Sequence, residues 1–195
     1  MDFEKIYKRI TSICIFLVLL LGPLVIISNY PGTYYESLEY RAVDELEDPY
    51  SYMDEVVNFL FGTGELKSFE EDEANHMKDV KNLITIGLLI ILFCCLIIFN
   101  YLLLSKDWSV FVKPSLGVLI IGFFIIIGVL LNFDFLFSYF HKIFFPMGNY
   151  AFPQDSLLIT LFPPEFFYKK SIEIFLYTSI LSVFTFLFGY YKRTS

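Results

Sequence analysis

Cysteine, histidine and tryptophan are all scarce in this chain of 195 residues, which contains three, two and one of them. The three cysteines, Cys14, Cys94 and Cys95, fall inside apolar segments and lack the paired spacing of a zinc site or a disulfide framework. The acidic run at residues 70–73 is explained as the first turn of a helix, where carboxylates interact favourably with the helix dipole. We therefore expect neither a metal ion nor a cofactor.

Motifs of several enzyme and binding classes are also missing. The chain has no Gly-x-Ser-x-Gly elbow, no Ser-x-x-Lys, and no histidine followed five positions later by aspartate, so a covalent acyl-enzyme is not indicated. It has no glycine-rich phosphate loop and no basic patch interleaved with aromatic residues. These absences exclude nucleotide and nucleic-acid binding as interpretations.

Apolar residues, in contrast, dominate the composition. They make up 56% of the chain, and its mean hydropathy is +0.63, which is too high for a soluble domain of this size. Apolar runs at residues 10–27, 83–104, 114–131 and 172–191 can each cross a hydrocarbon core about 30 Å thick as a helix. The sequence predicts an all-α integral membrane protein with four transmembrane helices in a single membrane domain, residues 1–195.

The distribution of charge predicts how the chain is oriented. Lysine and arginine favour the cytoplasmic side of a membrane, whereas the segment from Glu36 to Asp79 contains fourteen acidic residues. We expect both termini in the cytoplasm, and the long loops at residues 28–82 and 132–171 on the outer face. The basic residues of the short flanking segments are Lys5, Lys8, Arg9, Lys106, Lys113, Lys192 and Arg193.

Helical patterns continue into both outer loops. Residues 53–61 have apolar side chains at helical spacing, which predicts a short amphipathic helix. Ser68 and Glu71 fit a capping box, so one helix is expected over 69–104, with His76 just outside the hydrocarbon. The second loop has 13 aromatic residues among residues 132–170, which favours the outer membrane interface. The prolines at 153, 163 and 164 predict an irregular chain after the helical part of this loop.

Both histidines belong to these outer loops, and histidine is the side chain best suited to acid/base work near neutral pH. Around His76, carboxylates at positions 72, 73 and 79 are at helical spacing and could orient the imidazole or favour its charged form. In the second loop, Asp134, Ser138 and His141 share one helical face. The alternative is that the histidines are solvated or only contribute to packing.

Four stretches, residues 58–66, 73–80, 140–146 and 161–167, resemble the bacterial lipoprotein intramolecular transacylase family of four-span membrane proteins. The most specific elements are His-Met-x-Asp-Val, which starts at His76, and Phe-His-x-x-Phe-Phe, which starts at Phe140. The resemblance covers nearly the whole chain in the number of spans and the order of the loops. One departure is Tyr150, near which the family has a tryptophan.

The resemblance implies an O-to-N acyltransferase of the bacterial cytoplasmic membrane. Its expected substrate is a diacylglyceryl-modified lipoprotein, whose sn-2 acyl chain moves to the α-amino group of the same cysteine and leaves an N-acyl lyso-form; membrane phospholipid is the other expected partner. The matching histidines, His76 and His141, are the expected catalytic pair, with Asp79, Asp72 and Ser138 as supporting residues. Its carboxylate neighbours favour His76 as the base, although the roles could be exchanged.

Two other functions agree with the same residues. A non-catalytic accessory or sensor protein could use the acidic first loop to bind a partner while the histidines only titrate. A b-type haem carrier could ligate one iron with both histidines, in which case the purified protein would be coloured. Acyl transfer that depends on the histidines distinguishes the enzyme from both.

Overall fold

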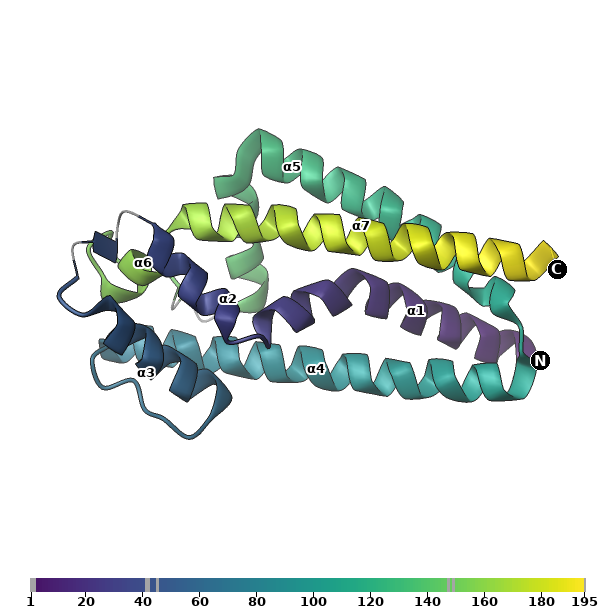
Figure 1. The fold of residues 1–195 in the computed structure, drawn as a ribbon, viewed down its shortest axis with the longest axis horizontal. Helices are drawn as coiled ribbons and strands as arrows, with labels where there is room; N and C mark the ends of the chain where they lie inside the picture. The colour runs from purple at the N-terminus through teal and green to yellow at the C-terminus, as the bar shows by residue number, and fades with distance from the viewer. Residues whose placement is uncertain (1–2, 41–42, 45, 147, 149, 195) are drawn as a thin grey trace. The chain divides into compact units, whose positions relative to one another are not determined.

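The computed structural model describes residues 3–40, 43–44, 46–146, 148 and 150–194, and this described part contains helices but no β-strand. Four helices are long and apolar enough to cross a membrane: α1 (Phe3–Ser28), α4 (Glu71–Ser105), α5 (Val112–Phe144) and α7 (Pro164–Thr194) (Figure 1). The four predicted spans are therefore confirmed, and each helix extends beyond its apolar run. The chain forms two compact units, each described here by itself.

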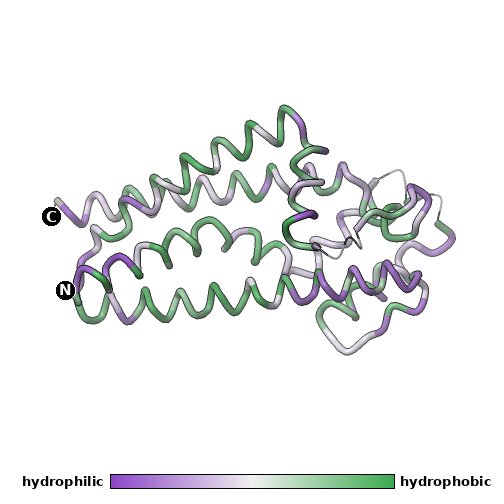
Figure 2. Tube along the Cα trace, turned by 180° about the vertical axis from the view of Figure 1, so that it is seen from behind, coloured by the Kyte–Doolittle hydropathy of each residue, from purple (hydrophilic) through white to green (hydrophobic). Residues whose placement is uncertain are grey.

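The first unit contains the apolar parts of the four long helices, Met1–Ile26, Ile86–Gly128 and Ile172–Ser195. Ile15 and Leu19 of α1 are buried against the other helices, and Gly117 of α5 faces the ring of Phe16 of α1. Many other large apolar side chains are exposed, as the green of the long helices in Figure 2 illustrates. Such a surface is suited to lipid rather than water.

The second unit, Ile27–Thr85 and Val129–Ser171, contains the shorter helices of the two long loops. They are α2 (Gly32–Tyr35), the 3-10 turn η1 (Glu36–Glu39), α3 (Pro49–Phe61) and α6 (Leu157–Leu161), and the unit also includes the adjoining ends of the long helices. Its apolar core consists of side chains from α3, α4, α6 and α7 and from Phe69 and Phe162, which flank α4 and α6. The buried members of this core are Met53, Val56, Phe59, Leu60, Phe69, Met77, Leu158, Leu161, Phe162 and Phe166.

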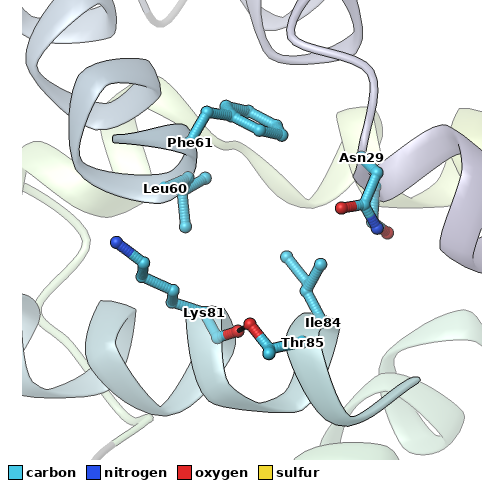
Figure 3. A pocket seen from close by; sticks show the side chains of 7 residues that line it. Asn29, Leu60, Phe61, Lys81, Ile84 and Thr85 are labelled. Atoms are coloured by element: carbon cyan, nitrogen blue, oxygen red, sulfur yellow. Dashed lines mark hydrogen bonds between the residues drawn. The ribbon is translucent and has the colours of Figure 1, made fainter. Parts of the chain in front are cut away.

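The helix predicted over 53–61 is confirmed as α3, which starts four residues earlier. Asp48 caps it, because its carboxylate accepts the Ser51 N–H, and Pro49 suits the first helical position. At its other end, the ammonium of Lys81 donates to the carbonyls of Phe59 and Gly62, at 2.5 and 3.0 Å. Lys81 also lines a cavity of about 40 Å³ between α3, α4 and the end of α1 (Figure 3).

The prediction of an irregular chain after residue 146 is wrong in part, because two helices begin in this segment. Ser156 caps the short helix α6, its hydroxyl accepting the Ile159 N–H, and α7 begins at Pro164, eight residues before its apolar run. Proline has no N–H to lose in the first helical turn and its φ is already helical, so Pro164 starts a helix instead of preventing one.

Glu73 connects the first turn of α4 to α6. The helix begins at Glu71 rather than near residue 69, and Glu73, only 2% exposed, accepts the Glu70 N–H at 3.0 Å through Oε2. Its Oε1 accepts the Leu158 N–H at 2.9 Å. Glu73 supplies the acidic half of a capping box two residues later than the predicted one, and both of its oxygens are used by the main chain rather than by His76.

We expect Glu73→Gln to lower the free energy of unfolding by roughly 1–3 kcal/mol. An amide has one oxygen where the carboxylate has two, so its NH2 group would face one of the two buried backbone donors. Thermal unfolding of the detergent-solubilised protein measures the change, with Glu71→Gln as the control because Glu71 lies in the same turn and is exposed. Equal melting temperatures for the two variants would contradict the role given to Glu73.

Candidate functional site

The structure brings the two histidines together within the second unit. Their ring centroids are 6.0 Å apart and the ring planes are inclined by 25°, although 65 positions separate them in the chain. His76 lies in the second turn of α4. His141 lies in the last turn of α5, beyond a break at Asn132, whose φ of −158° and ψ of 79° are not helical and whose side chain accepts the Phe135 N–H at 3.0 Å.

His141 is fixed by a main-chain hydrogen bond. Its Nδ1 lies 2.7 Å from the carbonyl oxygen of Phe137, one turn earlier in α5. Because a carbonyl oxygen only accepts, Nδ1 must carry the proton, and the neutral ring then has its lone pair on Nε2. Ser138, predicted to support this ring, is exposed, so the orienting group is the Phe137 carbonyl, which any helical sequence supplies.

His76 is buried, with 7% of its surface exposed, and its Nδ1 has no hydrogen-bond partner among the described residues. Burial, and next the charge of His141, lower the pKa of His76 from 6.5 to about 4; the charge of Asp79 acts in the opposite direction. Asp79 is half-buried, whereas Asp72 is exposed. Asp79 does favour the charged form of His76, as the sequence suggested, but burial outweighs it and the net pKa shift is downward.

Burial also lowers the pKa of His141, although the hydrogen bond to Phe137 counteracts the shift. Both rings are consequently neutral at pH 7, and each neutral ring offers one N–H donor and one acceptor nitrogen. His141 remains the better base of the two, because its bound Nδ1–H favours the protonated ring.

Aromatic side chains surround the two imidazoles. The rings of Phe145 and Phe152 lie 4.6 and 5.5 Å from His76, and those of Phe137 and Tyr150 lie 4.2 and 5.4 Å from His141. Phe137 and Phe145 could have been selected from the sequence, since each is four positions from His141; nothing in the sequence marks Phe152. Walls of this kind exclude water and suit acyl chains.

The lowered pKa of His76 predicts a loss of stability in acid. The unfolded chain binds the imidazole proton below pH 6.5 and the folded chain only below about pH 4, so the folded state is destabilised progressively as the pH falls between these values. For a shift of this size the full penalty is about 3 kcal/mol. Melting temperatures at pH 7 and pH 4.5 measure it; His76→Gln should flatten the dependence, and an unchanged dependence would contradict the burial argument.

Comparison with known proteins gives one family and one enzyme. The sequence profile of the family described as Lipoprotein intramolecular transacylase Lit matches residues 9–167. The crystal structure of the membrane-integral lipoprotein intramolecular transacylase Lit from Bacillus cereus superposes with a TM-score of 0.83 at 20% identity, over 98% of this chain and 96% of that one. No curated protein matches.

Two further structures of the Bacillus cereus enzyme carry a substitution of the same histidine. The arginine variant has a TM-score of 0.74 at 20% identity, over 98% of this chain and 92% of that one. The alanine variant has a TM-score of 0.74 at 21% identity, over 99% and 96%. At such identities the superpositions show a shared fold, while the profile match covers well over half of the sequence. The chain belongs to the lipoprotein intramolecular transacylase family.

Proposed function

We propose that this protein moves the sn-2 acyl chain of a diacylglyceryl-cysteine lipoprotein onto the α-amino group of the same cysteine, by histidine acid/base catalysis. The observation that carries the proposal is the pair of imidazoles 6.0 Å apart, one of them anchored through Nδ1 to a main-chain carbonyl. Such a pair can hold one proton acceptor and one proton donor against the same reacting group.

Once the substrate ammonium has lost one proton to solvent, the transfer itself needs only one proton to change place. The amine nitrogen forms a bond to the ester carbonyl carbon, and the bond from that carbon to the glycerol oxygen then breaks. The nitrogen loses a proton and the glycerol oxygen gains one, so no water and no second substrate enters the balance. The product is an amide and a free glycerol hydroxyl, the N-acyl lyso-form.

We assign the role of base to His141 and the role of oxyanion donor to His76. This is the reverse of the sequence-based assignment, in which the carboxylates around His76 favoured His76 as the base. With Nδ1–H bound to Phe137, the Nε2 of His141 is free to take the proton from nitrogen and to return it to the glycerol oxygen. His76 stays neutral, because its pKa is lowered to about 4, and it donates an N–H to the oxyanion that develops on the carbonyl oxygen.

The three supporting residues differ in burial, and we propose different roles for them. Asp79 is half-buried on the helix of His76 and lies within electrostatic range of its ring, so we propose it as the carboxylate that orients either His76 or the substrate ammonium. Asp72 and Ser138 are exposed, which leaves them free to contact the lipoprotein peptide.

Intramolecular transfer also explains why so little catalytic machinery suffices. Amine and ester belong to one substrate, and holding them in a reactive geometry can supply about 7–11 kcal/mol of barrier reduction. The site would lie at the outer face of the bacterial cytoplasmic membrane, beside the outer leaflet that holds the acyl chains of lipoproteins. The aromatic walls around the histidines would accept those chains.

Mass spectrometry of a lipoprotein's amino-terminal lipopeptide tests the proposal, in cells without other N-acylating enzymes and with or without this protein. We expect the total acyl content to stay constant while one chain moves from glycerol to nitrogen. A diacylglyceryl lipopeptide that keeps its free amine when the protein is present contradicts the proposal and favours the accessory-protein interpretation.

A further inference from the structure

The ring of Phe145 contacts both histidines, and among the described residues it is the one aromatic side chain that does so. Its centroid lies 4.6 Å from that of His76 and 5.5 Å from that of His141. Phe145 is itself 4% exposed. We propose that Phe145 is a positioning residue, whose ring holds the two imidazoles at their separation and keeps water from both; this inference rests on the proposed function.

The backbone explains how the ring comes to lie there. Phe145 follows the last residue of α5, and its N–H still donates to the His141 carbonyl at 2.8 Å, so it lies one helical turn beyond that histidine. The Gly148 N–H donates to the Phe145 carbonyl at 3.1 Å, and Gly148 has a φ of +79°, a conformation that glycine adopts readily. Both main-chain polar groups of Phe145 are therefore hydrogen-bonded, and the residue stays fixed to the histidine helix.

The other contacts of the two rings show why this position matters. His141 is held by Phe137 of its own helix, and His76 belongs to α4, so neither anchor sets the distance from one imidazole to the other. Phe152 contacts His76, and Phe140 and Tyr150 contact His141, but each of these rings is paired with only one histidine. Among the aromatic rings of the described residues, Phe145 is the one that contacts both imidazoles.

Loss of the ring should therefore have two separate effects. A misplacement of about 1 Å can cost about 10²-fold in rate, so acyl transfer should fall by that order in Phe145→Ala. Water admitted to the site would also remove the cause of the low pKa of His76, which burial dominates. A residue that only filled space in the core would lower stability without moving the histidine titration.

The experiment combines single-turnover transfer with NMR titration of histidines labelled with ¹⁵N, in the full-length protein in nanodiscs. We expect Phe145→Ala to lower the transfer rate about 10²-fold and to move the titration of His76 upward toward 6.5. Phe145→Leu keeps apolar bulk without a flat ring and should give a smaller change in the same direction. Phe144→Ala is the matched control, because Phe144 is the neighbouring residue and is exposed.

Two outcomes would overturn the inference. Folded Phe145→Ala and Phe145→Leu proteins with the parent's histidine titrations would show that the ring does not shield the pair; normal transfer rates would show that it does not position the pair. If Phe145→Ala does not fold, the transfer rate and histidine titration of Phe145→Leu test the inference instead. Failure of the unsubstituted protein to transfer an acyl chain would count against the proposed function alone, since the titrations still test the contact.

Discussion

His141→Asn is expected to lower the rate of acyl transfer by about 10²- to 10⁴-fold, the usual contribution of a general base. The asparagine amide nitrogen lies close to the position of Nδ1, so this variant can keep the hydrogen bond to the Phe137 carbonyl while it loses the basic Nε2. Structure and orientation are thereby preserved and only the base is removed. Single-turnover conversion of a diacylglyceryl lipopeptide, followed by mass spectrometry, measures the loss.

The control is Lys142→Gln, which changes the next, exposed residue of the same helix and should leave the rate unchanged. His141→Gln places an amide near Nε2 but offers no base, so it should be as slow as His141→Asn. A folded His141→Asn protein that transfers at the parent rate would remove His141 from the proton-transfer step. It would also return us to His76 as the base.

The sequence was sufficient for the membrane helices and for the expectation that His76 and His141 lie together. Apolar runs long enough to cross a bilayer have few alternatives, because every backbone polar group must be satisfied within the helix, so the four spans follow from length and composition. The scarcity of histidine made the pair equally easy to identify as candidates. With only His76 and His141 in the chain, both beside outer ends of predicted spans, a shared site was the simplest hypothesis.

What the sequence could not supply were contacts between distant segments. Glu73 was one of three carboxylates that could have acted on His76, three positions away in its helix, yet its carboxylate accepts an N–H from Leu158, 85 positions away. The burial of His76 depends in the same way on Phe145 and Phe152, which belong to the other loop. Helical spacing identifies neighbours on one helix, but the sign of a pKa shift depends on what the rest of the fold places against them.

The proposed roles of base and donor rest on a main-chain atom. The Phe137 carbonyl has no sequence signature, and only its 2.7 Å distance to Nδ1 fixes the tautomer of His141. Sequence reasoning considered Ser138 and the nearby carboxylates instead, because side chains are the groups that a sequence displays. Ser138 and Asp72 lie on the same helices as the histidines, but their side chains are exposed, whereas His76 is buried and His141 is half-buried.

Substitutions of His76 should give a different pattern from those of His141. If His76 donates a hydrogen bond to the oxyanion, His76→Ala should lower the transfer rate by about 10²- to 10³-fold, the usual cost of losing one such donor. His76→Gln keeps an N–H at a similar distance along the side chain, so it should recover about tenfold of that loss, the worth of one modest hydrogen bond. The same lipopeptide assay measures both rates.

The comparison across the two positions is the decisive one. A donor can be replaced by an amide, whereas a base cannot, so glutamine should rescue the rate relative to alanine at position 76 and fail to do so at position 141. The variants also share a check on folding, since the melting temperature of each is measured at pH 7, where both histidines are neutral. Rescue by glutamine at 141 and not at 76 would reverse the assignment and make His76 the base, with its low pKa then limiting how readily it accepts the proton.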